Sequence, residues 1–248
     1  MPVTPAHAAA AWPLRKIAPR LPLSALVIGA MSPDYEFFLR LAPITRWAHK
    51  PAGLLLFCLP VSIAVWFVFR QIVRPALVEL LPPGLARALR KPSASWVGAL
   101  VAVALGALTH VVWDGFTHEH DWAVVTWPVL RDEVAPAVLP RLHWYNVLQH
   151  VSTILGLTTL VVWVTGWVRS APPDARRWSP EQRARAARAV ALVALLTLVA
   201  ATVNAVQATA WLMRLSRFTV GGMIGFSVGL LVLGLGHRAT KRVHDADD

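Results

Sequence analysis

Long apolar stretches alternate with polar connections along the chain. The apolar stretches cover residues 53–69, 96–113, 147–168, 189–208 and 218–235. Each is close to the roughly 20 residues that a helix needs to cross the ~30 Å hydrocarbon layer of a membrane. Residues 21–31 are also apolar but too short to span. The pattern predicts an all-α, polytopic membrane bundle with five transmembrane helices, preceded by short N-terminal helices that are re-entrant or interfacial.

Composition supports the membrane assignment and limits the metal chemistry. Hydrophobic residues make up 56% of the chain and charged residues 15%, and the mean hydropathy is +0.53. Many of the tryptophans fall near the ends of the apolar stretches, where an interfacial aromatic belt is expected. Cys58 is the single cysteine, which excludes an internal disulfide and a thiolate zinc cage. Any bound metal must therefore use nitrogen and oxygen ligands.

The basic residues are spread over the connections between the apolar stretches. Although the net charge is +11, this distribution predicts orientation signals and no nucleic-acid partner. The connections at residues 70–93 and 169–188 are basic, whereas residues 114–145 contain five acidic and two basic residues. We therefore expect residues 70–93 and 169–188 in the cytoplasm, and residues 114–145 and the N-terminal segment on the other side.

The second apolar stretch ends in an unusual group of polar residues, Gly-Ala-Leu-Thr-His-Val-Val-Trp-Asp-Gly-Phe-Thr-His (residues 106–118). On a helix, residues four apart share a face, so His110 and Asp114 lie one above the other, with His118 near the same stripe. An imidazole and a carboxylate are costly to bury unpaired in lipid. They should face a protein interior, a metal ion or water. A chance pair satisfied by a neighbouring helix would explain them equally well.

Three residues earlier in the chain are expected on the same side of the membrane. His7 follows Thr4-Pro5, which resembles a helix start with Thr4 as the N-cap, and Asp34 lies in a Ser-Pro-Asp-Tyr-Glu block. His49 precedes the turn into the first span. A mobile terminus, a helix dipole and the membrane interface would account for them one by one. Their shared side with His110 and Asp114 instead favours a common site.

The same blocks, in the same order, carry a resemblance to a known family. They are Thr-Pro-x-His, Ser-Pro-Asp-Tyr-Glu-Phe-Phe, a His before Gly-Leu-Leu-Leu-Phe-x-Leu-Pro, Gly-Ala-Leu-Thr-His-x-x-Trp-Asp-x-Phe-Thr-His and Leu-Gln-His-x-Ser-Thr. This chain resembles the bacterial membrane family of the domain of unknown function numbered 4184, over nearly its whole length. The resemblance implies a multi-pass protein of the bacterial inner membrane.

A more distant similarity is to inner-membrane metal-dependent hydrolases, whose ligand layout is like that of zinc-dependent phospholipase C. The order of His, Pro-Asp, His and Gly-x-x-x-His-x-x-x-Asp, followed by Trp127-Pro128, carries it. That similarity implies metal ligands at His7, Asp34, His49, His110 and Asp114, with His118 and His150 as further candidates. Lys50 and Pro51 stand where the hydrolases have a second His or an Arg. This difference argues against a full di- or trinuclear site but not against a single metal.

Histidine and carboxylate ligands of this kind suit a divalent metal, with zinc as our expectation. Zinc with an open position lowers the pKa of bound water to about 7 and so supports hydrolysis. A site at the membrane surface suggests a lipid or lipid-linked phosphoester, whose negative charge Arg40, Arg46 and Lys50 could meet. The sequence has no Gly-rich phosphate loop, Gly-x-Ser-x-Gly elbow or His-Glu-x-x-His motif, which excludes the nucleotide, serine-hydrolase and zincin classes.

The C-terminal third has the character of a scaffold. Residues 1–168 are predicted to form the metal-site membrane domain, residues 169–188 a basic cytoplasmic connector, and residues 189–248 a two-span scaffold with a basic tail. Ser179-Pro180-Glu181-Gln182 matches a capping box. Gly221, Gly225 and Gly229 predict close packing against another helix of this chain or of a second copy, so a homo-oligomer is one expectation.

Three classes of function therefore stay open from sequence. A membrane-embedded metal-dependent hydrolase accounts for the most residues. A non-catalytic metal- or proton-binding protein such as a transporter is the second, and a structural or partner-binding membrane protein the third. Charged residues buried within several spans would favour transport, whereas here they gather at the span ends.

Overall fold

The chain is a bundle of helices. The computed structural model describes residues 3–82, 86, 89, 95–135, 137–170 and 178–247. Within these residues, five helices are long and apolar enough to cross a membrane, namely Pro51–Leu80, Trp96–Asp114, Trp144–Ser170, Pro180–Ala205 and Trp211–Arg242. They confirm the predicted all-α class and the five predicted spans. The first of them continues to Leu80, well beyond its predicted end at residue 69.

Two widened turns interrupt the first span. It consists of α5 (Pro51–Gly53), a π turn (η3, Leu54–Cys58), α6 (Leu59–Val68), a second π turn (η4, Phe69–Val73) and α7 (Arg74–Leu80). Each π turn comes directly before a residue that precedes proline, Leu59-Pro60 in the first case and Arg74-Pro75 in the second. Proline has no N–H and its ring crowds the carbonyl four residues earlier, and a local π turn relieves that clash.

The chain folds into two compact units, each made of segments separated in sequence. Unit 1 contains Met1–Asp34, Arg46–Ala64 and Ala94–Gly166, and unit 2 contains Tyr35–Thr45, Val65–Ser93 and Trp167–Asp248. The division of the chain near residues 168 and 188 into a site domain, a connector and a scaffold stays a prediction.

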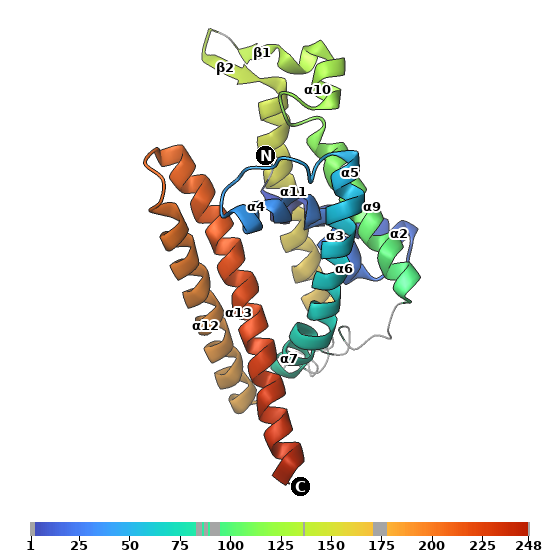
Figure 1. Ribbon diagram of the computed structural model, residues 1–248, viewed down its shortest axis with the longest axis vertical. Coiled ribbons are helices and arrows are strands. Elements are labelled where there is room, and N and C mark those ends of the chain that lie inside the picture. Colours follow the sequence, from blue (N-terminus) through green and yellow to red (C-terminus); the bar gives the residue numbers. More distant parts are fainter. Residues whose placement is uncertain are drawn as a thin grey trace. The chain divides into compact units, whose positions relative to one another are not determined.

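Unit 1 is built on the packing of a short helix against the second span. The N-terminal helices are α1 (Thr4–His7), η1 (Ala8–Ala10), α2 (Ala11–Ile17) and α3 (Leu23–Met31), followed by the 3-10 turn η2 (Ser32–Asp34). Helix α3, expected from the apolar residues 21–31, packs along α9 (Trp96–Asp114) (Figure 1). A Cβ at Gly29 would lie 2.3 Å from the Val103 carbonyl oxygen, and one at Gly106 would lie 2.4 Å from the Leu26 carbonyl oxygen. Glycine on both helices is therefore required for this close approach.

The connection after α9 carries the small amount of β structure, which was not predicted. It contains α10 (Trp122–Thr126), the 3-10 turn η5 (Pro128–Arg131), and an antiparallel hairpin of β1 (Glu133–Ala135) and β2 (Leu139–His143). Phe116 packs against both Trp122 and Trp127, at centroid distances of 5.5 Å. The connection then leads into α11 (Trp144–Ser170).

Unit 2 is dominated by a helical hairpin of α12 (Pro180–Ala205) and α13 (Trp211–Asp247), which lie side by side in Figure 1. The unit also contains α4 (Tyr35–Arg40). Gly221 and Gly225 face α12, where added Cβ atoms would lie 2.4 and 2.3 Å from the carbonyl oxygens of Ala200 and Leu196. Of the two packing alternatives, these glycines thus use a helix of the same chain. The Asn204 amide of α12 donates to the Arg217 carbonyl of α13 at 2.8 Å, which is an interhelical hydrogen bond. The predicted Ser179 capping box is confirmed.

Candidate metal centre

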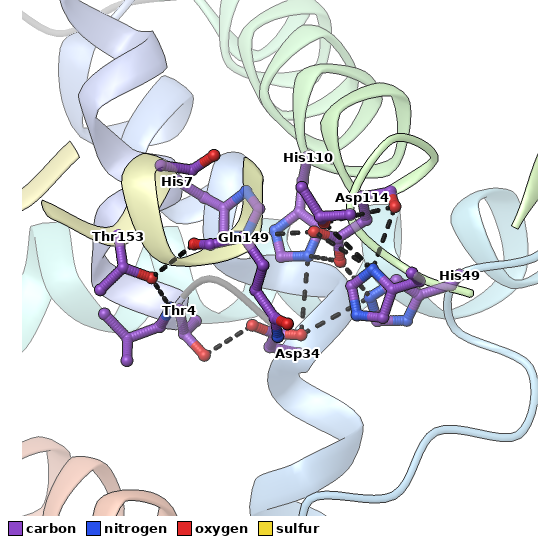
Figure 2. A network of polar contacts seen from close by, with 12 residues as sticks. Thr4, His7, Asp34, His49, His110, Asp114, Gln149 and Thr153 are labelled. Carbon is purple, nitrogen blue, oxygen red and sulfur yellow. Dashed lines mark hydrogen bonds and ion pairs between the residues drawn. The ribbon is translucent and has the colours of Figure 1, made fainter. Parts of the chain in front are cut away.

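Four side chains from distant parts of the sequence converge in unit 1 (Figure 2). Asp34 ends η2, His49 lies in the turn before α5, and His110 and Asp114 are one turn apart on α9. One potential ligand atom from each of the four lies within 4.8 Å of all the others. The predicted helical ladder of His110 and Asp114 is therefore completed by two residues that the fold brings to it.

The separations between these atoms match those within a metal coordination shell. His110 Nε2 lies 3.1 Å from Asp114 Oδ2 and 3.5 Å from Asp34 Oδ1. His49 Nε2 lies 3.3 Å from Asp114 Oδ2 and 3.5 Å from Asp34 Oδ1. Two ligands held tetrahedrally around zinc at 2.0–2.1 Å would themselves be about 3.3–3.4 Å apart. Four of the six separations are thus close to those around one zinc ion, and the other two do not exceed 4.8 Å.

Several buried polar atoms of the cluster lack a hydrogen-bond partner among the described residues. Asp34 Oδ1, His110 Nε2 and both carboxylate oxygens of Asp114 are buried and make no well-directed hydrogen bond to a described residue. Asp34 and His110 have 0% exposure and Asp114 has 1%. Two buried carboxylates need compensating positive charge, and a divalent cation would supply it in full. The donor set therefore fits a divalent metal.

Hydrogen bonds behind the cluster orient its members. The His110 Nδ1 nitrogen lies 2.7 Å from the Ala30 carbonyl oxygen, so Nδ1–H donates to it and Nε2 is the ring nitrogen that faces the carboxylates. The Thr4 hydroxyl donates to Asp34 Oδ2 at 2.5 Å, which leaves Oδ1 directed at the cluster. Metal-binding histidines and carboxylates usually have such supporting partners. The arrangement depends on the glycine contact between α3 and α9, which brings Ala30 to His110.

Close packing against the start of the first span positions His49. A Cβ at Gly53 would lie 1.9 Å from the Trp47 carbonyl oxygen, so only glycine lets the preceding turn fold back here. The Cys58 thiol donates to the Ala48 carbonyl at 3.4 Å. The lone cysteine thus holds the backbone next to His49 and lies outside the metal cluster.

His7 lies beside the four-residue cluster. Its ring stacks on that of His110 at a centroid distance of 3.7 Å, and its Nε2 is 3.4 Å from Asp114 Oδ1. That oxygen is the one not used in the contacts with His49 and His110. Burial lowers the pKa of His7 to about 3, so its imidazole is neutral at pH 7 and retains a lone pair. The structure therefore brings together all five residues that the resemblance implied as ligands.

The other ionisable groups respond to the same charges. Burial opposes ionisation of Asp34, but the neighbouring His110 and His49 hold the pKa of its carboxyl well below the usual range. Burial likewise opposes a charge on His49, yet its close contacts with Asp114 and Asp34 raise the pKa of its imidazole above the ordinary value. Without a cation, protons on histidine would have to balance the carboxylates. A divalent cation would take their place.

The two further candidates differ in their distance from the cluster. His118 lies at the rim, partly exposed, with Nδ1 3.0 Å from the Asp114 carbonyl oxygen and 3.9 Å from its Oδ1. His150 is an exposed residue of α11 and is not a member of the cluster. Asp121, not considered from sequence, lies 3.7 Å from His118, and burial raises the pKa of its carboxyl.

The expected role of Thr4 was wrong. Val3 is the N-cap of α1 and makes no side-chain cap, whereas Thr4 is the first helical residue. The Thr4 hydroxyl turns instead to Asp34, because a charge-assisted hydrogen bond to a buried carboxylate is stronger than a cap on a four-residue helix. The Thr-Pro-x-His block was the sequence signal for the contact between Thr4 and Asp34. A threonine before proline is equally typical of a helix start, so the block did not decide between the two roles. The hydrogen bond from His110 to the Ala30 carbonyl could not be predicted from the residue types, because its acceptor is a backbone group.

Fold and site together define a multi-pass helical membrane protein with a buried cluster of histidine and aspartate residues able to hold a metal ion. Within that class, the chain belongs to the family Domain of unknown function (DUF4184), which matches residues 1–235. No curated protein matches the chain. No solved structure matches it either.

Proposed function

We propose that this protein is a membrane-embedded, metal-dependent hydrolase that acts on a phosphoester of a lipid or lipid-linked substrate. The observation that carries the proposal is the convergence of four ligand atoms, from the buried Asp34, His110 and Asp114 and the half-buried His49, at separations that suit one cation. Imidazole nitrogens together with carboxylate oxygens suit zinc, and Fe²⁺ or Mn²⁺ could bind the same donor set.

Each residue around the cluster has a role in this proposal. A bound divalent cation that accepted water as a fifth ligand beside these four side chains would supply Lewis-acid activation of that water. Asp34 and Asp114 hold it with negative charge, and Thr4 and the Ala30 carbonyl keep Asp34 and His110 in their binding orientation. His118, at the rim beside Asp121, is placed to exchange a proton with solvent or a leaving group.

The surroundings favour an anionic substrate at a membrane. Arg46 and Lys50 are exposed and flank His49 in the sequence, so their positive charge can attract a phosphoester. The basic connections between spans favour a bacterial inner-membrane protein whose site faces away from the cytoplasm. Reporter fusions test this orientation: a fusion after Arg185 should be cytoplasmic and one after Glu133 should not. The reverse result would place the site in the cytoplasm.

Asp114→Asn is the variant that tests hydrolysis most sharply, because the amide keeps the shape of the side chain and removes one ligand charge. Detergent-purified wild-type protein should hydrolyse bis(p-nitrophenyl) phosphate or phospholipid in vesicles, and the loss of activity in Asp114→Asn should parallel its loss of metal. Asp132→Asn is the matched control. Asp132 is an exposed aspartate in the connection between α9 and α11, so its substitution changes the charge equally without touching the four-residue cluster. An Asp114→Asn protein with wild-type turnover would overturn the proposal.

A further inference from the structure

A large apolar groove opens beside the metal centre. It has a volume of about 830 Å³ and lies between the N-terminal helices, the end of α9 and residues 148–159 of α11. Its walls are mainly apolar, and they include His7, Ala10, Trp113, Leu155 and Gly156. The volume is within the 300–1,000 Å³ typical of ligand sites, which are also mostly apolar with a few polar groups.

The groove exists because α11 is held to the N-terminal segment at two small residues. The Val3 N–H donates to the Thr153 hydroxyl at 3.3 Å, and a Cβ at Gly156 would lie 2.7 Å from the Ala6 carbonyl oxygen. Next to these contacts the lining residues Ala6, Ala9 and Ala10 are small, and the N-terminal helices add the larger Trp12 and Lys16 to the lining. Small side chains on this wall leave a long slot open where larger ones would close it.

His7 connects the groove to the metal centre. It lines the groove, while its ring stacks on His110 and its Nε2 faces Asp114 (Figure 2). The lining residues of α11 run from Leu148 to Thr159, which at 1.5 Å per residue is about 16 Å of helix. A molecule in the groove would therefore lie along a membrane span and touch the metal centre at His7.

The surroundings of the groove determine what can fill it. Helices α9 and α11 are both long and apolar enough to span a membrane. In the most apolar 18 residues of α11, no residue is buried inside the protein. An apolar groove on that face meets hydrocarbon chains and not water. Where Ala6, Ala9, Ala10 and Gly156 line it, the groove presents few side-chain atoms, which suits an unbranched chain better than a methyl-branched one.

We infer that this groove binds an acyl chain of a glycerophospholipid and thereby presents the lipid phosphoester to the metal centre. The inference rests on the proposed hydrolase function for the role of the headgroup. Binding of the chain itself needs only the groove. The substrate class is accordingly a diacyl phospholipid, with the bond to be cleaved where His7 lines the groove.

Photo-crosslinking tests the groove independently of catalysis. The full-length protein in vesicles is irradiated with a phosphatidylglycerol that carries a diazirine in the middle of one acyl chain. Labelled peptides should map to residues 148–159 of α11 or to the N-terminal helices. Labelling should be the same in Asp114→Asn, because the groove does not depend on the metal. Uniform labelling of all lipid-facing helices would overturn the inference, and so would preferential labelling by a polyprenyl phosphate probe.

A matched pair of variants separates the groove from the rest of the lipid-facing surface. Leu155 lines the groove, whereas its neighbour Ile154 does not, and both are largely exposed in the protein alone. Leu155→Trp should fill the slot. Since excluding two methylenes weakens binding roughly tenfold, labelling should fall by about that factor. Ile154→Trp should label like wild type. Equal labelling of the two variants would refute the assignment.

Kinetic measurements then test whether binding of the acyl chain in the groove contributes to the hydrolysis reaction. With phospholipids of increasing chain length, KM should fall in the wild type, and Leu155→Trp should remove this dependence. Absence of turnover with every phosphoester would refute the hydrolase proposal while the crosslinking still decides the groove. Turnover that is independent of chain length in the wild type would refute the groove and leave the hydrolase proposal standing.

Discussion

Replacing Thr4 with valine tests whether the cluster is a metal site with a supporting shell. Valine keeps the shape of the side chain but removes the hydroxyl that donates to Asp34 Oδ2 at 2.5 Å. Asp34 is fully buried, so no water can replace the lost donor without a rearrangement. A hydrogen bond to a charged group contributes about 1.5–3 kcal/mol, and supporting partners of metal ligands typically change metal affinity about 10- to 100-fold. We expect the Thr4→Val protein to bind zinc about 10- to 100-fold more weakly.

The assay is a competition titration with a chromogenic chelator on detergent-purified protein that has been stripped of metal and reloaded. Thr4→Ser retains the hydroxyl and should restore most of the affinity. Thr126→Val is the control, because this exposed threonine of α10 donates to the Trp122 carbonyl and to none of the ligands. Wild-type affinity in Thr4→Val would refute the supporting role of Thr4, and with it the orientation of Asp34 toward a cation.

Three further predictions follow from the packing and the charges. Gly29→Ala places a Cβ 2.3 Å from the Val103 carbonyl oxygen and should destabilise the protein by about 1–3 kcal/mol in thermal unfolding, with loss of metal, whereas Gly166→Ala, with open space around it, should change little. The pKa of His49 is raised in the metal-free protein, so protonation of His49 stabilises the fold below its ordinary pKa of 6.5, and this stabilisation is lost as the pH rises through the folded-state pKa. Zinc must displace this proton. The zinc affinity measured between pH 8 and pH 6 should therefore fall toward pH 6, with proton release on binding. A pH-independent affinity would contradict this. Asn204→Ala removes the hydrogen bond to Arg217 in unit 2 and should cost about 0.6 kcal/mol of stability without changing the metal content; a loss of metal would show that this hairpin also supports the site.

The spans and one half of the site could be predicted from sequence because they depend on local patterns. Hydropathy over about 20 residues identifies a spanning helix, and the four-residue spacing of His110 and Asp114 places them on one face whatever surrounds them. The approach of Asp34 and His49 to that face has no local pattern. It was expected from the order of the sequence blocks and from the shared side of the membrane, and the structure brings these residues together.

The features that could not be predicted depend on contacts between distant backbones. Gly29 and Gly106 each look like an ordinary helical glycine, and their pairing becomes visible only when α3 lies on α9. The Ala30 carbonyl reaches His110 as a result of that pairing. Thr4 could cap its own helix or bond elsewhere, and the nearby buried carboxylate decides between the two. The hairpin of β1 and β2 is too short to produce a clear alternating pattern.

Metal analysis of the purified protein tests the central claim most directly. After reconstitution with zinc and removal of excess, the wild type should hold about one ion per chain, and X-ray absorption should find nitrogen and oxygen ligands at about 2.0–2.2 Å without sulfur. His110→Ala removes the ligand whose Nε2 approaches both carboxylates and should abolish stoichiometric binding while the protein still inserts in the membrane. A wild-type protein without stoichiometric metal, or a His110→Ala protein that retains it, would contradict the account.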